Sequence, residues 1–204
     1  MRTYTHFTQS IIFVISSMLS SGFALSQSEY SAGLQLGTGF ASDNYKDPLT
    51  LGGYIESEAL DFATLRGTVS YAFGDTEQDI LSKGDFDMLS FELSMIKRLE
   101  KEGAAPFLGA GVGYYIPNTD IDQRLDNALS SVGLRVDEDL DSAIGFHLLA
   151  GFDVPLSEDS SIEFMGKYIV AETEVDAEVN GGLAAIFDVD LNALFVTVGI
   201  RKQF

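Results

Sequence analysis

Few residues in this sequence are of a type that could support catalysis. There is no cysteine, and histidine occurs only at positions 6 and 147. A catalytic histidine acts as a general base when a nucleophile lies within hydrogen-bond reach of it. Ser90 and Ser94 are the candidate nucleophiles, but nothing in their spacing requires them to approach His147. We therefore expect His147 to be a hydrogen-bonded structural residue, and we do not expect the chain to be an enzyme.

Acidic residues offer a second kind of chemistry, the binding of cations. The chain has 31 Asp and Glu residues against 12 Lys and Arg residues, a net charge of -19. The stretches DEDLD (137–141) and DVD (188–190) carry the oxygen ligands that calcium and magnesium prefer. Neither stretch has EF-hand spacing, and dense acidic loops are usually solvated, so we expect no metal and no cofactor. The lack of clustered basic residues excludes nucleic acid as a partner.

The segments that must position these residues alternate with a period of two. Apolar residues recur at every second position, which is typical of β-strands with one apolar face and one small or polar face. Beyond the amino-terminal region, no segment has the 20 or so apolar residues of a transmembrane helix. Eight such strands and no predicted helix indicate an all-β fold. Their even number is typical of bacterial outer-membrane barrels, so we predict an eight-stranded antiparallel up-and-down transmembrane barrel. The eight predicted strands span 30–40, 49–56, 64–73, 89–95, 107–115, 145–154, 162–170 and 194–201.

The connections between the predicted strands alternate in length. Those at 59–61, 99–105 and 156–160 are short, whereas those at 42–47, 74–87, 118–142 and 171–190 are longer and strongly acidic. Short turns at one end and long loops at the other are typical of outer-membrane barrels. With the mature amino terminus in the periplasm, every long loop lies outside the cell.

The face opposite the apolar one would line the lumen. An eight-stranded barrel is just wide enough for its own side chains to fill. Buried charges are costly unless they are paired, so we expect a network of salt bridges rather than an open pore, with a thin polar path as the alternative. The predicted lumen residues are Glu56, Arg66, Glu92, His147, Asp153, Glu163, Lys167 and Arg201.

Aromatic residues on the apolar face gather towards the ends of the predicted strands. Outer-membrane barrels carry such girdles where the apolar band meets the two membrane interfaces. The predicted girdle consists of Tyr30, Phe40, Tyr71, Phe73, Tyr114, Phe146, Phe152 and Tyr168.

The amino terminus has the order of a secretory signal. Arg2 precedes the apolar run IIFVISSML, and Ala24 and Ser26 provide a small-x-small cleavage site. The run is too short for a spanning helix. We expect residues 1–26 to be a cleaved signal peptide and residues 27–204 to form one barrel domain.

The carboxy terminus resembles the assembly signature of bacterial outer-membrane proteins. A terminal Phe204 follows apolar residues at alternate positions, Ile200, Val198 and Val196, although Lys202 stands where that family usually has an apolar or aromatic residue. The stretches PFLGAGVGYY (106–115) and GFHLLAGFDVPLSEDSSIEFMGKYIV (145–170) are similar to the outer-membrane beta-barrel domain family, the OmpA-like and OmpX-like eight-stranded barrels. The resemblance implies recognition by the barrel-assembly machinery.

These observations together lead to an expected function. We expect an integral protein of the bacterial outer membrane, in contact with its lipid and lipopolysaccharide, monomeric, and with a structural or surface-interaction role through acidic extracellular loops. The alternative is a narrow channel for small solutes. A soluble periplasmic lipocalin-like carrier, with its apolar face turned inward, and a barrel enzyme are less favoured.

Overall fold

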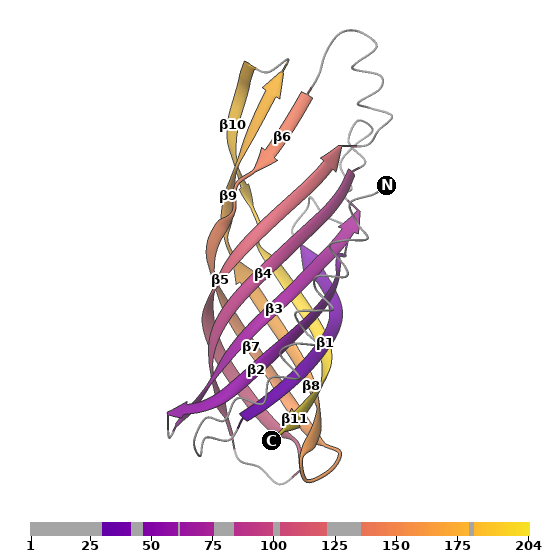
Figure 1. Cartoon of the computed structure of the whole chain (residues 1–204), viewed down its shortest axis with the longest axis vertical. Coiled ribbons are helices and arrows are strands. Elements are labelled where there is room, and N and C mark those ends of the chain that lie inside the picture. Colours follow the sequence, from indigo (N-terminus) through magenta and orange to yellow (C-terminus); the bar gives the residue numbers. More distant parts are fainter. Residues whose placement is uncertain are drawn as a thin grey trace.

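A closed barrel of eight antiparallel strands forms the body of the protein (Figure 1). The computed structural model describes residues 30–41, 47–60, 62–75, 84–99, 103–121, 136–179 and 182–204. No helix within these ranges is long and apolar enough to cross a membrane. The barrel strands are β1 (Tyr30–Ala41), β2 (Leu49–Leu60), β3 (Ala63–Asp75), β4 (Gly84–Arg98), β5 (Ala105–Ile121), β7 (Ala143–Pro155), β8 (Ser160–Val170) and β11 (Ala193–Gln203).

The last strand closes the barrel against the first. β11 pairs with β1 from Gln203 opposite Ser31 to Ala193 opposite Ala41. The amide of Phe204 adds a hydrogen bond of 2.8 Å to the carbonyl of Tyr30. Every barrel strand thus has two neighbours, as a bilayer requires, because lipid cannot satisfy an unpaired backbone edge. The predicted eight-stranded antiparallel barrel is confirmed.

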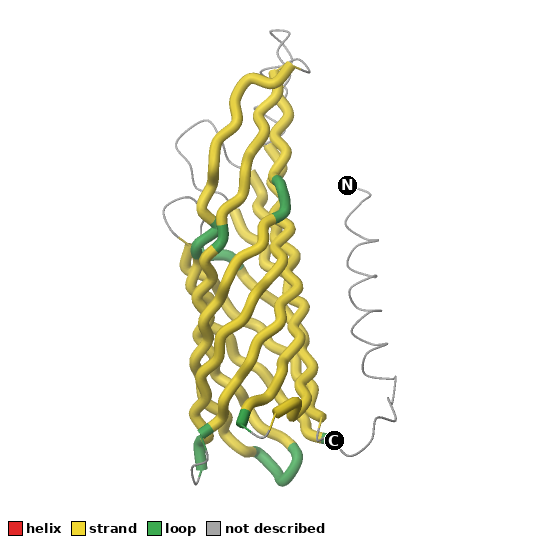
Figure 2. Tube along the Cα trace, turned by 90° about the vertical axis from the view of Figure 1, so that its left-hand side faces the viewer, coloured by secondary structure: helices red, strands yellow, loops and turns green. Residues whose placement is uncertain are grey.

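A three-stranded sheet continues beyond one end of the barrel, opposite the carboxy terminus (Figure 2). Its order is β10 (Gly182–Asp190), β9 (Glu172–Val179), β6 (Val136–Leu140). We predicted loops at 118–142 and 171–190, and this is wrong for these three strands. The reason is visible in ETEVDAEV, which alternates acidic with apolar or β-branched residues and so has a strand period. We call this end of the barrel external and the opposite end periplasmic.

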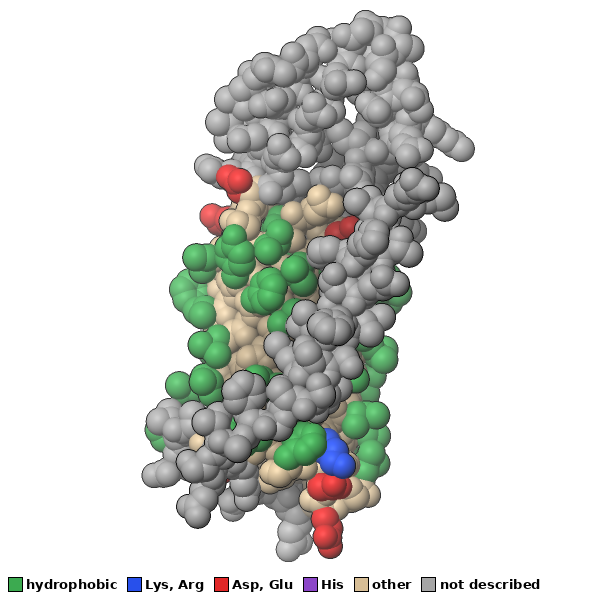
Figure 3. Space-filling model, in the orientation of Figure 1, with side chains coloured by type: hydrophobic (Ala, Val, Ile, Leu, Met, Phe, Trp, Pro, Cys, Tyr) green, Lys and Arg blue, Asp and Glu red, His purple; other side chains and the backbone are tan. Residues whose placement is uncertain are grey.

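The apolar face of the barrel points outward. Leu36 and Leu148 are 60% and 64% exposed, whereas the inward-facing Arg66 is 1% exposed. Hydrophobic side chains cover the barrel wall, and acidic side chains lie near its two ends (Figure 3). A lipocalin-like carrier would need the opposite arrangement. An exterior of this kind is stable in hydrocarbon, where outward apolar residues need no cover.

The aromatic residues of the predicted girdle all lie on the outward face. Phe40, Phe73 and Phe146 lie close to the external ends of β1, β3 and β7. Tyr114 is mid-strand in β5, but it lies at the barrel rim, because β7 begins opposite Tyr115. The remaining four are Tyr71 and Tyr168 towards the external ends of their strands, and Tyr30 and Phe152 towards the periplasmic ends.

Candidate functional site

Six charged side chains meet inside the periplasmic half of the barrel. Arg66 is the centre: its Nε lies 2.7 Å from Glu56 Oε1, and its Nη1 lies 2.9 Å from Glu163 Oε1. Its Nη2 also pairs with Glu163 Oε2. The guanidinium stacks on the ring of Tyr54, with 3.9 Å between Cζ and the ring centroid. The periplasmic cluster consists of Arg66, Arg98, Arg201, Glu56, Asp153 and Glu163, three positive and three negative residues.

Arg98 is a member of this cluster that the sequence analysis missed. Its Nε donates to Asp153 Oδ2 and its Nη2 to Glu56 Oε1, both at 2.9 Å. The predicted fourth strand ends at Met95, whereas β4 continues to Arg98. The alternation that puts Ser94 inward also puts Ile96 and Arg98 inward, so two further periods of the same pattern reach Arg98.

A second ion pair lies farther along the lumen. Lys167 Nζ lies 2.6 Å and 2.7 Å from the two carboxylate oxygens of Glu92. Lys167 also lies over the ring of Phe195, at 5.7 Å from its centroid. Both partners are almost fully buried. Both carboxylate oxygens accept hydrogen bonds from Lys167, so the two charges neutralise each other inside the lumen.

His147 forms a hydrogen bond to Ser94 rather than to the cluster. Its Nε2 lies 2.7 Å from Ser94 Oγ, and its Nδ1 lies 3.4 Å from Tyr115 Oη. A serine beside a histidine is the first requirement of nucleophilic catalysis. His147 and Ser94 are each 1% exposed, so no substrate reaches them in this conformation. The absence of enzymatic activity stays a prediction.

Apolar side chains fill the lumen between and beyond the charged groups. One layer lies beside the periplasmic cluster and consists of Ile96, Phe107, Leu149 and Met165. A second layer, nearer the external end, includes Met88, Tyr115, Ile169 and Phe195. The cavity beside Lys167 and Phe195 has a volume of about 10 Å³. A single water needs about this much space, so this cavity holds one water at most.

The periplasmic mouth is more open. A cavity of about 660 Å³ is lined by Glu56, Arg98 and Arg201 among others, and one of about 180 Å³ lies beside Asp153 and Ser161. Within the part of the chain that the structure describes, Arg98 Nη1, Asp153 Oδ1 and Ser161 Oγ are buried without a protein partner. The lumen therefore has open space at its periplasmic end, whereas side chains fill it farther in.

The predicted assembly residues lie on the outward face of β11. Val196, Val198 and Ile200 are exposed on the barrel wall, and Phe204 is 71% exposed at the periplasmic rim. Lys202, also on this face, lies 3.4 Å from Asp159 in the β7–β8 connection. Recognition by the assembly machinery stays a prediction.

The strand register of the external sheet collects acidic residues on one face. In β9, acidic residues occupy alternate positions, and each lies directly opposite an acidic residue of β6 or β10. Residues directly opposite in antiparallel strands share a face. None of the three strands contains a Lys or Arg. This acidic face consists of Asp137, Asp139, Glu172, Glu174, Asp176, Glu178, Asp188 and Asp190.

The two stretches considered as cation ligands, 137–141 and 188–190, contribute to this face from either side of β9. Among the residues whose side chains are described, no group of three or more His, Cys, Asp or Glu could hold a metal ion. The predicted signal peptide at 1–26 lies outside the described residues.

Comparison with known proteins identifies the fold. No family model matches the chain, and no curated protein matches it. The crystal structure of the outer-membrane protein OprG from Pseudomonas aeruginosa matches with a TM-score of 0.67 and 16% identity, covering 87% of this chain and 96% of that one. The outer-membrane protein AlkL in lipid bilayers matches with a TM-score of 0.62 and 13% identity, covering 91% and 94%.

Neisserial surface protein A is also similar, with a TM-score of 0.57 and 14% identity, covering 88% of this chain and 98% of that one. These likenesses agree with the predicted outer-membrane location and with the apolar exterior. The chain has the eight-stranded barrel fold of bacterial outer-membrane proteins.

Proposed function

We propose that this protein is an outer-membrane scaffold that presents an acidic β-sheet to a cationic partner at the cell surface. The observation that carries the proposal is the strand register of β6, β9 and β10, which puts eight acidic residues and no basic residue on one face. Like charges directly opposite in a sheet are destabilising. The acidic face keeps these repulsive pairs, and a partner rich in Lys and Arg would be complementary to it and would reduce the repulsion.

The filled lumen supports a scaffold more than a narrow channel. Two apolar layers and two sets of ion pairs occupy the barrel interior, and they come from strands all around the wall. Ions crossing such a lumen would have to displace paired charges and dry side chains at once. We therefore place the function on the external sheet and assign the lumen a structural role.

The experiment that tests this proposal is binding of a fluorescent oligolysine peptide to the protein in nanodiscs of neutral lipid. We expect saturable binding that weakens steeply as salt rises, because exposed charges are screened within about 8 Å at physiological ionic strength. A variant with Glu174→Gln and Asp176→Asn, at the centre of the acidic face, should bind the peptide several-fold more weakly.

The matched control is Glu138→Gln with Glu58→Gln. Glu138 lies in the same sheet, but it is opposite Ala177 and so on the other face, and Glu58 is exposed at the periplasmic end of β2. This control removes the same amount of charge and should bind as the wild type does. Equal weakening in both variants would mean that net charge alone attracts the peptide, and the proposed site would be wrong.

A further inference from the structure

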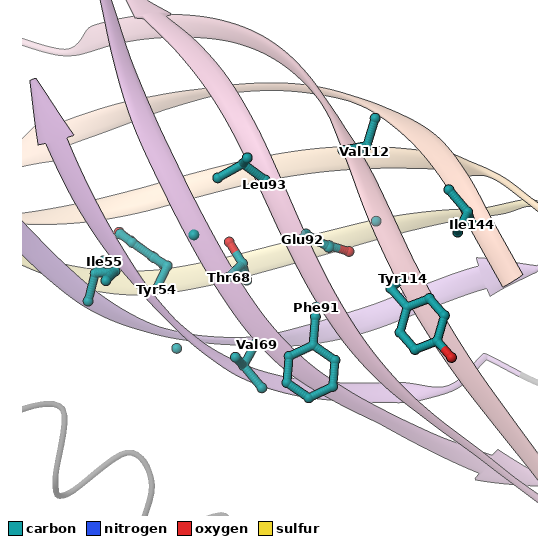
Figure 4. Close-up of a pocket in the computed structure, with 13 residues that line it drawn as sticks. Tyr54, Ile55, Thr68, Val69, Phe91, Glu92, Leu93, Val112, Tyr114 and Ile144 are labelled. Carbon is teal, nitrogen blue, oxygen red and sulfur yellow. The ribbon is translucent and has the colours of Figure 1, made fainter. Parts of the chain in front are cut away.

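A shallow groove crosses the outer wall of the barrel from β2 to β7. Its volume is about 480 Å³, within the range of small-ligand sites. Its floor is the backbone of one row of paired residues, Tyr54, Thr68, Glu92 and Gly113, whose larger side chains turn into the lumen (Figure 4). We call this feature the wall groove.

Two rows of outward-facing residues form the sides of the wall groove. Each row includes a glycine, and because glycine has no side chain the side of the groove is interrupted there. The row on the external side consists of Gly53, Val69, Phe91, Tyr114 and Ile144, and the row on the periplasmic side of Ile55, Gly67, Leu93 and Val112.

The groove climbs from the middle of the membrane to its external surface. Gly53 lies near the middle of β2, whereas Ile144 is the second residue of β7 at its external end. Four strand spacings of about 4.8 Å give a length of about 19 Å. Strands tilted by about 40° incline such a row by the same angle, so it rises about 12 Å, close to the roughly 15 Å thickness of one hydrocarbon leaflet.

The wall groove faces the hydrocarbon of the membrane, and this favours an apolar occupant. The lining side chains are apolar and face hydrocarbon, where unfilled space forfeits dispersion contacts. A flexible acyl chain that descends from the outer leaflet matches both the length and the slope. A second protein chain is not needed to cover a groove that lipid can fill.

Polar groups at the upper end of the groove indicate the kind of lipid. Tyr114 Oη and Ser142 Oγ are exposed and hydrogen-bonded at 2.5 Å. Asp141, also exposed, precedes Ser142 in the chain. Two hydroxyl groups and a carboxylate together suit the several hydroxyls of a sugar headgroup, which a phosphatidylethanolamine headgroup lacks.

From these observations we propose that the wall groove binds one acyl chain of an outer-leaflet glycolipid of the lipid A type. Tyr114, Ser142 and Asp141 would receive its sugar. The proposal rests on the outer-membrane location, but not on the partner proposed for the acidic face.

Gly67 provides a clean way to fill the groove. A Cβ added there meets only Ile55 Cγ1, at 3.9 Å, an ordinary van der Waals contact, so Gly67→Leu starts its side chain in the groove without a clash. Gly166 on β8 is the matched control. It also faces outward, its added Cβ meets only the carbonyl of Ala150 at 3.9 Å, and it lies outside the groove.

The test is native mass spectrometry of the protein purified from outer membranes and transferred to phosphatidylcholine nanodiscs that contain a small fraction of lipid A. We expect one retained lipid A for the wild type and for Gly166→Leu, and about tenfold less for Gly67→Leu. Equal retention by all three proteins would overturn the proposal. Parallel nanodiscs containing phosphatidylethanolamine instead of lipid A identify the source, and equal retention of that lipid would overturn the assignment to lipid A.

Heat-modifiable gel mobility verifies that each variant is a folded barrel. If Gly67→Leu does not fold, Val112→Phe narrows the groove from the same side with a residue suited to lipid. A groove variant that no longer retains lipid A should still bind oligolysine. That result would show that the wall groove and the acidic face act independently.

Discussion

Arg66 and Glu163 join opposite walls of the barrel, with Arg66 Nη1 at 2.9 Å from Glu163 Oε1. Their strands, β3 and β8, are four steps apart in either direction around the barrel. Both side chains are 1% exposed. The pair therefore spans the full width of the lumen, and removal of either residue alone leaves the other charge buried without this partner.

Removal of one partner should destabilise the barrel strongly. We expect Arg66→Met or Glu163→Leu alone to lower the free energy of unfolding by about 3–5 kcal/mol, the usual cost of an uncompensated buried charge. Urea unfolding of the refolded protein in lipid bilayers measures this change. The double variant Arg66→Met with Glu163→Leu should lie closer to the wild type than either single variant, because it leaves no charge of this pair behind. A double variant that is the sum of the two singles would contradict a direct coupling.

The wild-type protein should show no single-channel conductance. The cavity beside Lys167 measures only about 10 Å³ and two apolar layers occupy the lumen, so we expect no discrete openings in a planar bilayer. Arg66→Ala combined with Glu92→Ala removes a large side chain and breaks both ion-pair sets, and it should produce openings. Regular wild-type openings that change in this variant would instead favour the narrow channel.

Inward-facing glycines should tolerate no side chain, unlike the outward Gly67. A Cβ at Gly111 would lie 2.2 Å from the carbonyl oxygen of Leu93 and 2.6 Å from His147 Nε2. We expect Gly111→Ala to lower the free energy of unfolding by about 1–3 kcal/mol through overpacking. Gly67→Ala, measured by the same urea titration, is the control and should change it by less than about 0.5 kcal/mol. Similar losses for both would mean that backbone entropy and not space decides the effect.

The terminal aromatic residue should matter for assembly more than for stability. The Phe204 side chain is exposed, and its contribution to closure is a backbone hydrogen bond to Tyr30 that alanine retains. We expect Phe204→Ala to refold in vitro with nearly unchanged stability but to accumulate poorly in the outer membrane of cells. Phe152→Ala, another outward aromatic towards the periplasmic end, is the control for a loss of lipid contact. Equal membrane levels of the two variants would argue against a terminal assembly signal.

Local sequence patterns predicted most of the barrel wall. Leu148 and Arg66 take the outward and inward positions that alternation assigns, since successive side chains of a strand point to opposite faces. The same rule places Arg98 inward, two periods beyond Ser94. It also predicts a strand at 172–179, because acidic residues alternate there with apolar or β-branched ones.

The sequence by itself determined the eight barrel strands, their two faces and the short periplasmic connections, because these depend on neighbours within a few positions. Only the tertiary structure decided which lumen charges meet, because Arg66 and Glu163 are 97 residues apart and come together through closure and strand stagger. The acidic face and the wall groove were decided in the same way. Both are rows that run across strands, and the register of pairing, not the order of residues along the chain, brings their members side by side.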